Sequence, residues 1–376
     1  MKVRAAVLTR TGAPAPYAES RPLEVTEVDL APPGPGEVLV RIAAAGLCHS
    51  DLSIINGDRP RRTPIVLGHE AAGVVEALGE GVTDLEPGDH VILVFVASCG
   101  HCDPCSEGRP VLCEPAAAAN VAGTLLGGGK RLSYQGETID HFIGVSAFAE
   151  YAVLSRRSLQ KIDKELPLEI AALFGCAVMT GVGAVVNTAQ VRPGQSVAVV
   201  GLGGVGLSAL MGALAAGASR VVAVDLADDK LVLAKALGAT DVINAGAANA
   251  VEQLRELTGG GVDHALEMVG SAKALEFAYK VTRRGGTTVT VGLPASSQNL
   301  MTPVWHLVAE ERTLKGSYLG SCVPRRDIGR FVSLYRNGRL PVDQLLTGRL
   351  PLEQINEGFD RLHRGEAIRQ VIVMNP

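Results

Sequence analysis

The chain has 376 residues, of which 47% are hydrophobic and 20% are charged, and its formal net charge is −4. This length suits two domains, and an acidic balance without a basic stripe excludes nucleic acid as an expected partner. The N-terminal residues scatter charges among apolar ones and lack a signal-peptide core. We therefore expect a soluble cytoplasmic protein with no membrane partner.

The first roughly 160 residues predict a β-rich region. Apolar runs at 38–45 and 91–96 alternate with turn sequences rich in proline and glycine, such as 32–36 and 87–89. The short alanine run at 116–119 is interpreted as a loop.

Four of the seven cysteines lie close together, with the spacing C-x2-C-x2-C-x7-C. An odd cysteine count excludes complete disulfide pairing, and such crowding in a reducing compartment indicates a metal site. A ferredoxin-type cluster is the main alternative, but it expects a shorter final spacing followed by proline, whereas Glu114 follows here. The spacing favours a structural zinc with no open coordination position. Its ligands would be Cys99, Cys102, Cys105 and Cys113.

From about residue 180, apolar runs alternate with helical patterns, which predicts a doubly wound parallel sheet. The uncharged stretch at 201–219 begins with glycines after a strand, so a buried nucleotide-binding helix fits it better than a membrane span. The tail at 322–376 predicts two helices and a final strand at 368–374 that returns to the first domain. The six predicted strands are 196–200, 220–225, 241–244, 262–268, 286–292 and 313–319.

The motif Gly201-x-Gly203-x-x-Gly206 follows the first of these strands and opens a helix. Its glycines allow a tight turn and a close approach of the backbone to pyrophosphate. Asp225 ends the next strand, where a carboxylate binds the ribose hydroxyls of NAD and repels the 2′-phosphate of NADP. Capping of the following helix by Asp225 is the alternative. Lys230, one turn further on, is a second candidate for the ribose.

Three further residues are dispersed: Cys48 in GLCHSD, His69 in LGHE and Cys176 in FGCAVMTG. Taken singly, each has an ordinary interpretation as a buried thiol or a hydrogen-bonded core histidine. No spacing rule joins them.

A resemblance to a known family does join them. The motifs GLCHSDL, GHEAAGVVEALGEGV, PGDHV, the four-cysteine loop, GC-x3-TG, GLGGVGLS, VGLP and IRQVIV occur in order along the chain. In this order they resemble the zinc-containing alcohol dehydrogenases of the medium-chain dehydrogenase/reductase superfamily. The resemblance implies an α/β protein with a GroES-like β-rich catalytic domain at 1–177 and 321–376 and a Rossmann NAD-binding domain at 178–320.

The resemblance also implies roles for single residues. Cys48, His69 and Cys176 would bind a catalytic zinc, Glu70 would lie near it, and Asp51 would orient the histidine. Two zinc ions per chain are therefore expected. Ser50 would accept the proton of the alcohol, but Ser53 occupies the position where many relatives carry the histidine that ends the proton relay. The remaining expected cofactor contacts are His49, Gly204, Val205, Val291 and Arg369.

The expected substrate pocket is lined by Phe95, Phe142, Ile143, Leu293 and Tyr318, with core packing as the alternative for Ile143 and Leu293. These residues suggest an aromatic or allylic primary alcohol or its aldehyde. Arg59, Arg61 and Arg62 form either a solvated face or an attraction for an anionic substrate.

Two alternative activities remain open at this point. One is a formaldehyde dehydrogenase that acts on a glutathione or mycothiol adduct, although the segment EPAAAAN after Cys113 lacks the arginine of the glutathione-dependent relatives. The other is a nicotinoprotein that keeps its NAD bound. A homodimer or homotetramer is expected, with the run at 286–292 offering a sheet edge to a second subunit.

Overall fold

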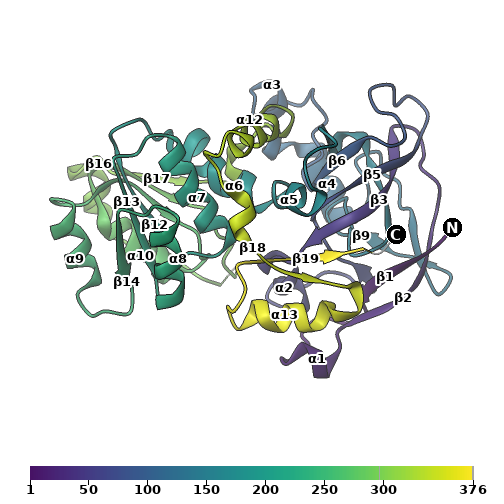
Figure 1. Ribbon diagram of the computed structural model, residues 1–376, viewed down its shortest axis with the longest axis horizontal. Coiled ribbons are helices and arrows are strands. Elements are labelled where there is room, and N and C mark those ends of the chain that lie inside the picture. Colours follow the sequence, from purple (N-terminus) through teal and green to yellow (C-terminus); the bar gives the residue numbers. More distant parts are fainter. Residues whose placement is uncertain (296, 375–376) are drawn as a thin grey trace. The chain divides into compact units, whose positions relative to one another are not determined.

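The computed structural model describes residues 1–295 and 297–374, and the chain divides into two compact units. The first unit contains Met1–Cys176, Val323–Ile328 and Asp343–Pro376. The second contains Ala177–Cys322 and Gly329–Val342. Helix α12 (Pro324–Arg336) crosses the boundary (Figure 1).

The first unit is built on two β-sheets, as its alternating apolar runs predict. One sheet has the order β8 (Glu137–Thr138), β7 (Leu132–Tyr134), β2 (Leu23–Leu30), β1 (Lys2–Leu8), β4 (Ile65–Val66) and β9 (Asp140–His141). The other has the order β11 (Leu159–Ile162), β6 (His90–Val94), β5 (Glu70–Leu78), β3 (Glu37–Gly46), β19 (Arg369–Val373) and β18 (Leu346–Leu350), and β10 (Tyr151–Ser155) also pairs with β3. The tail thus returns to the first unit through β19.

Short helices connect the strands of this unit. They are α1 (Tyr17–Ser20), α2 (His49–Ile55), α3 (Asp103–Ser106), α4 (Glu114–Ala122), α5 (Leu168–Leu173) and α13 (Ile355–His363). The interpretation of 116–119 as a loop is wrong, because these alanines lie inside α4. Alanine has the highest helix propensity, Pro115 sits in the first turn, and Gly123 ends the helix in the left-handed conformation.

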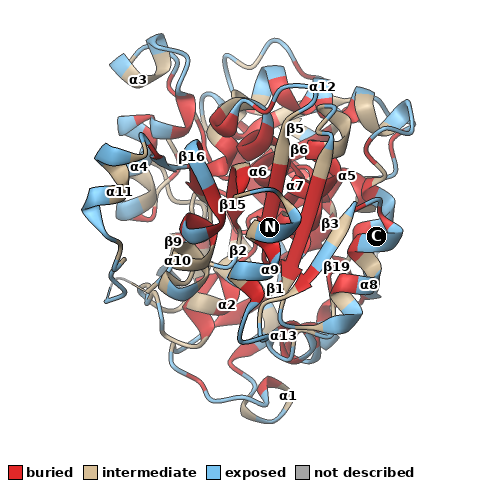
Figure 2. Ribbon diagram, turned by 90° about the vertical axis from the view of Figure 1, so that its left-hand side faces the viewer, coloured by how far each residue is buried: buried red, intermediate tan, exposed pale blue. Residues whose placement is uncertain are grey.

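The second unit contains one parallel sheet with helices packed against it. Its strand order is β14 (Asp241–Asn244), β13 (Arg220–Asp225), β12 (Ser196–Val200), β15 (Val262–Glu267), β16 (Thr282–Thr290) and β17 (Thr313–Gly316). The helices are α6 (Ala177–Gly183), α7 (Gly204–Ala215), α8 (Asp228–Ala236), α9 (Ala250–Leu257), α10 (Ala272–Val281) and α11 (Val304–Ala309). Figure 2 shows β15 mostly in the colour of buried residues, while α9 exposes part of its surface.

This strand order is that of a Rossmann sheet, in which the direction of winding reverses between β12 and β15. The predicted α/β class is confirmed. The uncharged stretch after β12 forms α7, most of which is buried, and no helix among the described residues is long and apolar enough to cross a membrane.

The prediction that 286–292 forms a free sheet edge is wrong. Strand β16 pairs with β15 on one side and with β17 on the other, so β17 is the edge strand. The run predicted at 313–319 ends as a strand at Gly316, and all four residues of β17 are exposed. The apolar run at 286–292 therefore identifies the inner strand β16 and not the edge strand β17.

Candidate active site

Four side chains that the sequence places far apart meet in the first unit. The ligand atoms of Cys48, His69, Glu70 and Cys176 all lie within 4.8 Å of one another, and all four residues are buried. Burial of two thiols, an imidazole and a carboxylate together is unfavourable unless a cation or hydrogen bonds compensate them. Two sulfurs, a nitrogen and an oxygen are ligands that zinc accepts.

The neighbouring strands β3 and β5 position Cys48, His69 and Glu70 close together. Strand β3 ends at Gly46 and Cys48 follows it as the residue before α2, while His69 directly precedes β5. The two strands are antiparallel, with Ala45 opposite Ala71, so the end of one lies beside the beginning of the other. Gly68, at φ +93°, lets the chain enter β5, because a Cβ there would lie 2.6 Å from the nitrogen of Phe148.

Asp51 fixes the orientation and the tautomer of His69. Its buried carboxylate lies 3.1 Å from Nδ1 of His69 and accepts a hydrogen bond from the backbone N–H of Gly68 at 3.0 Å. A proton on Nδ1 leaves the lone pair of Nε2 available, and Nε2 has no hydrogen-bond partner in the described part of the chain. The imidazole is therefore prepared to bind a metal through Nε2.

Electrostatic interactions within the cluster favour a bound cation. A hydrogen bond from Cys176 lowers the pKa of Cys48 well below its usual range, with further lowering by His69 and Arg369. The same hydrogen bond, together with burial, raises the pKa of Cys176 well above normal. Burial raises the pKa of Glu70 to about 7, although Arg369 lies 3.5 Å away and opposes the shift. A divalent cation would stabilise the charged forms of both thiols and of the carboxylate.

The predicted four-cysteine loop closes into a second cluster. Its sulfur atoms also lie within 4.8 Å of one another, and all seven cysteines of the chain are free thiols. Backbone N–H groups donate to the sulfurs, from Cys99 to Cys113 at 3.2 Å and from Cys102 to Cys99 at 3.3 Å. A hydrogen bond from the His101 backbone lowers the pKa of Cys99 to about 6. Burial raises the pKa of Cys105 to about 12 and also raises that of Cys113, so a bound cation is needed to keep these two thiols ionised. Four cysteine sulfurs at this spacing fit a structural zinc.

The glycine motif forms the turn between β12 and α7 in the second unit. A Cβ on Gly201 would lie 2.4 Å from the Val269 side chain, and one on Gly206 would lie 1.8 Å from the carbonyl oxygen of Gly201. A Cβ on Gly203 would meet nothing within 4 Å. Two of the glycines therefore serve helix and strand packing, and Gly203 leaves open space beside the helix N-terminus, where Gly204 and Val205 begin α7.

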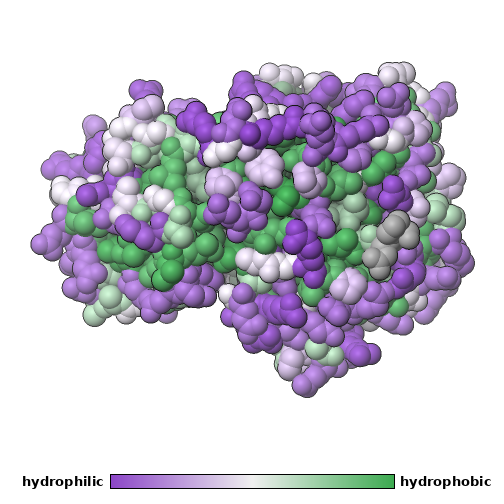
Figure 3. Space-filling model, in the orientation of Figure 1, coloured by the Kyte–Doolittle hydropathy of each residue, from purple (hydrophilic) through white to green (hydrophobic). Residues whose placement is uncertain are grey.

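Asp225 ends β13 beside this turn. Its carboxylate accepts hydrogen bonds from the backbone N–H groups of Leu202 at 2.7 Å and Ala227 at 3.0 Å. The alternative that Asp225 caps α8 is wrong, because Ala227 occupies the cap position without a side-chain cap. Lys230 lies half-buried on α8 and Val291 follows β16. Figure 3 shows hydrophobic side chains over α8. Leu226, directly after β13, is 72% exposed and belongs to none of the sequence motifs.

The other predicted residues fall into two groups. In the first unit, the rings of Phe95 and Phe142 contact the His69 ring edge to face, with centroids 5.4 and 5.9 Å apart. His49 is exposed at the start of α2, Ser50 is half-buried beside it, and Ile143 is half-buried with φ +42°. In the second unit, Leu293 is 57% and Tyr318 is 40% exposed.

Arg369 occupies a place that its motif did not predict. It is buried in the metal-ligand cluster, where it faces Glu70 and donates to the backbone carbonyl of Leu47 at 3.3 Å. Glu267, at the end of β15, also belongs to none of the sequence motifs. Its buried carboxylate accepts from Val269 at 2.7 Å and from the Thr290 hydroxyl at 2.7 Å, and so ties the two strand ends together. Neither residue lies in a motif whose spacing reveals such a role.

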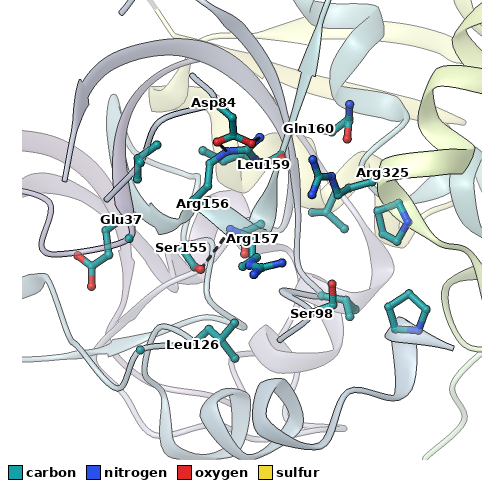
Figure 4. A pocket seen from close by; sticks show the side chains of 18 of the residues that line it. Glu37, Asp84, Ser98, Leu126, Ser155, Arg156, Arg157, Leu159, Gln160 and Arg325 are labelled. Atoms are coloured by element: carbon teal, nitrogen blue, oxygen red, sulfur yellow. Dashed lines mark hydrogen bonds and ion pairs between the residues drawn. The ribbon is translucent and has the colours of Figure 1, made fainter. Parts of the chain in front are cut away.

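A larger cavity of the first unit lies away from this cluster (Figure 4). It has a volume of about 610 Å³ and is lined by Arg156, Arg157 and Arg325 among others. Asp84 holds the Arg156 guanidinium through two contacts of 2.7 Å. No member of the Cys48 cluster lines this cavity.

The first unit contains two clusters of side chains whose ligand atoms suit zinc. The second unit contains a glycine turn that suits a dinucleotide. Together these features define a zinc-dependent dehydrogenase. Residues 34–164 match the family model of the alcohol dehydrogenase GroES-like domain, and residues 204–336 match that of the zinc-binding dehydrogenases. The chain belongs to the zinc-containing alcohol dehydrogenases of the medium-chain dehydrogenase/reductase superfamily, and it is an NAD-dependent enzyme that acts on small molecules.

Similar proteins span the whole chain. The S-(hydroxymethyl)glutathione dehydrogenase of Escherichia coli O1:K1 is 40% identical over 376 residues, covering 99% of this chain and 100% of its own. The class-3 alcohol dehydrogenase of Drosophila melanogaster is 40% identical over 362 residues, covering 95% of each chain. The crystal structure of benzyl alcohol dehydrogenase from Acinetobacter calcoaceticus superimposes with a TM-score of 0.93 at 34% identity and 100% coverage of both chains.

We predict that Asp51→Asn weakens zinc binding at the Cys48 cluster. Loss of the carboxylate partner of a metal-ligating histidine typically lowers metal affinity roughly 10- to 100-fold. Zinc content measured by mass spectrometry after dialysis against graded chelator should fall from two ions to one at a lower chelator concentration than in the wild type. Asp58→Asn, which removes an exposed carboxylate, is the matched control. Equal zinc retention in both variants would contradict the role of Asp51.

We also predict that two glycines of one motif respond differently to substitution. Gly206→Ala should lower the free energy of unfolding by about 1–3 kcal/mol, because the added methyl group overlaps a backbone oxygen. Gly203→Ala should leave unfolding by urea unchanged and weaken NADH binding, because its methyl group enters the open space. Urea unfolding and fluorescence titration with NADH separate the two effects. Identical profiles for the two variants would show that the glycines share one role.

Proposed function

We propose that the enzyme transfers a hydride between NAD and a primary alcohol or its aldehyde, with an aromatic or allylic group beside the hydroxyl. The observation that carries this proposal is the contact of Phe95 and Phe142 with His69. Their rings place an apolar aromatic wall against the imidazole of the metal cluster. Ile143, Leu293 and Tyr318 are proposed to complete the pocket.

We propose that Cys48, His69 and Cys176 hold the catalytic zinc and that Cys99, Cys102, Cys105 and Cys113 hold the structural zinc. When bound, the catalytic ion supplies Lewis acidity that favours negative charge on the alcohol oxygen. Asp51 holds the His69 ring. Arg369 offsets the charge of Glu70, which is the fourth member of the cluster and adds a nearby oxygen ligand.

Proton transfer is assigned to Ser50. Its hydroxyl lies two residues after Cys48, at the start of α2, and would take the proton of the alcohol. Ser53 does not extend this path, because its hydroxyl already donates to the backbone carbonyl of His49 at 2.7 Å. Protons would leave Ser50 through water or the cofactor ribose.

The second unit is proposed to bind NAD through Gly201, Gly203, Gly204, Val205 and Gly206, with Asp225 and Lys230 at the adenosine ribose. The Asp225 carboxylate disfavours the 2′-phosphate of NADP. His49 and Arg369 would contact the pyrophosphate, and Val291 the nicotinamide. The functional division is proposed as a catalytic domain at 1–177 and 321–376 and an NAD-binding domain at 178–320.

A second activity is supported by the comparisons, namely oxidation of the S-hydroxymethyl adduct of a thiol. The curated relatives at 40% identity include S-(hydroxymethyl)glutathione dehydrogenases. However, Glu114 and Pro115 begin α4 after Cys113, in place of the arginine that the glutathione-dependent relatives carry. We therefore propose a simple alcohol as the first candidate substrate. The mycothiol adduct of formaldehyde is the second candidate and the glutathione adduct is the third. A nicotinoprotein, with NAD reoxidised in place, is the remaining variant.

We propose that the chain forms a homodimer or homotetramer and works in the cytoplasm. The support for assembly lies at the edge of the second sheet. One side of strand β17 pairs with no other strand among the described residues, and Trp305 and Val308 on α11 are 67% and 78% exposed. A second copy would cover both the strand edge and these apolar side chains.

We predict that Ser50→Ala lowers kcat roughly 10²- to 10⁴-fold while leaving zinc content unchanged, because proton transfer loses its acceptor. Ser53→Ala is the control in the same helix and should change kcat little. Steady-state oxidation of benzyl alcohol with NAD measures both variants. Near-normal turnover by Ser50→Ala would refute its assignment.

We predict that benzyl and allyl alcohols are oxidised with NAD at higher kcat/KM than with NADP, and that formaldehyde is not oxidised faster when thiols are added. The measurement compares formaldehyde alone, with glutathione and with mycothiol. Strong activation by either thiol would replace the first proposal by the second. An absorbance of reduced nicotinamide in the desalted protein after alcohol is added would identify a nicotinoprotein.

A further inference from the structure

Three hydroxyl groups of the second unit are joined by hydrogen bonds. Oγ1 of Thr188 donates to Oγ of Ser321 at 2.9 Å and lies 2.8 Å from Oγ of Ser317. A hydroxyl group carries a single proton, so Thr188 accepts its second hydrogen bond from Ser317. Thr188 and Ser317 are buried, and none of the three residues belongs to a motif of the nucleotide site. Thr188 thus connects both ends of the segment 317–321.

The segment 317–321 has a backbone conformation that needs support from outside. Leu319 has φ +48°, Gly320 has φ +64° and Ser321 has φ +50°. This left-handed region suits glycine, whereas Leu319 and Ser321 adopt it at a cost in free energy. Such residues keep this conformation only when the surrounding structure holds them. The hydrogen bonds of Thr188 at both ends of the turn supply part of this support.

Close packing against α6 and the helix after it adds to this support. A Cβ on Gly320 would lie 2.5 Å from the carbonyl oxygen of Met179, so the segment contacts the backbone of α6 directly. Nδ2 of Asn187 donates to the carbonyl oxygen of Gly320 at 3.3 Å. Asn187 and Thr188 lie in the π-helix Ala184–Ala189, a conformation that is rare and frequent at functional sites. Two neighbouring residues of this helix therefore hold the same segment.

Strand pairing places the segment on the nicotinamide side of the sheet. Strand β17 ends at Gly316, and the backbone N–H of Ser317 donates at 2.9 Å to the carbonyl of Thr290, the last residue of β16. The segment thus leaves the carboxyl end of the sheet beside Val291. Parallel sheets of this kind bind dinucleotides outside the carboxyl ends of their strands, across the switch point between β12 and β15. Asp225 on β13 is assigned to the adenosine ribose, so the nicotinamide half belongs to the side of β15, β16 and β17.

We propose that Thr188 is a positioning residue for the nicotinamide half of NAD. Its hydroxyl group holds the segment 317–321 beside Val291 in the conformation that this half requires. The inference rests on the proposed function, which assigns NAD to the glycine turn and its nicotinamide to Val291. Because the segment is ordered before the cofactor arrives, binding does not have to order it. Thr188 therefore raises the affinity for the nicotinamide half and leaves the affinity for the adenosine half unchanged.

The test compares NADH with ADP-ribose, which has the adenosine and the pyrophosphate but lacks the nicotinamide. Thr188→Val keeps the shape of the side chain and removes its hydroxyl group. Calorimetric titration should show roughly 5- to 30-fold weaker NADH binding, the change that corresponds to one or two hydrogen bonds, and unchanged ADP-ribose binding. Thr188→Ser retains a hydroxyl group and should restore most of the NADH affinity. Unchanged NADH binding in Thr188→Val, or an equal loss for both ligands, would overturn the proposal.

Thr282→Val is the matched control within the same sheet. Thr282 is buried, and its hydroxyl group donates to the carbonyl of Ala278 at 2.8 Å and lies 2.7 Å from that of Thr288. It begins β16, at the end of the strand opposite to Val291. Both valine variants should lower the melting temperature, because each removes buried hydrogen bonds. Only Thr188→Val should lower the ratio of NADH affinity to ADP-ribose affinity, and an equal change in Thr282→Val would assign the effect to stability and contradict the proposal.

Hydrogen exchange of the backbone amides at 317–322 tests the same residue in the absence of cofactor. Exchange should be faster in Thr188→Val than in the wild type and unchanged in Thr282→Val, because only the first variant releases the segment. Equal exchange in all three proteins would show that Thr188 does not hold it.

A second variant covers the case in which Thr188→Val folds poorly. Ser317→Ala/Ser321→Ala removes the same hydrogen bonds without altering Thr188 and should reproduce the selective loss of NADH affinity. NADH binding at the wild-type level in this variant would overturn the proposal. If the wild type bound neither NADH nor ADP-ribose, the proposed NAD site would be refuted, and hydrogen exchange would still decide whether Thr188 holds the segment.

Discussion

Strand β3 carries the hydrogen bonds on which the active site depends. It pairs with β5 along one edge and with β19 along the other, with Ala45 opposite both Ala71 and Ile372. Cys48 follows the end of β3, His69 directly precedes β5, Glu70 begins β5, and Arg369 begins β19. A shift of one residue in either pairing would turn alternate side chains to the other face of the sheet and separate the cluster. The register of three strands is therefore the first requirement of the chemistry.

This register gathers groups that the fold alone does not satisfy. Both carboxylate oxygens of Glu70 and Nε2 of His69 are buried and lack hydrogen-bond partners among the described residues. Each unsatisfied buried polar group costs about 1–3 kcal/mol, and more when it is charged. Arg369 is the only cation of the described chain paired with Glu70, at a distance of 3.5 Å. A divalent ion would remove most of this cost, so metal binding and the stability of this part of the fold are coupled.

The sequence predicts some parts of the molecule well because their signals are local. The glycine turn, the four-cysteine loop and the order of β and α segments depend on residues that are neighbours in the chain, and the structure confirms the fold class. The cluster of Cys48, His69 and Cys176 depends on strand pairing between distant segments, so only the resemblance to a family joined those residues. The buried place of Arg369 and the hydroxyl hydrogen bonds of Thr188 could not be found from spacing, because each is defined by three-dimensional neighbours.

The wrong predictions for 286–292 and 116–119 have different physical causes. Apolar composition identifies buried segments, but it does not say which segment lies at a boundary. The apolar run at 286–292 belongs to an inner strand, and the exposed edge is the more polar β17. The alanine run of α4 is short and so suggests a loop, but helix propensity favours the observed helix and Gly123 ends it. Strand pairing determines the position of 286–292 in the sheet, and helix propensity determines the conformation of 116–119.

Strand ends and connecting segments have separate roles in this scaffold. The Cys48 cluster is held by β3, β5 and β19, and a substitution there would disturb metal binding. The segment that leads into β4, and helix α4 after the last cysteine of the four-cysteine loop, lie outside these three strands. Helix α4 therefore begins with Glu114 and Pro115 without any effect on the register of β3. The residues around the metal cluster can differ in charge and size while the ligands that hold the metal keep their places.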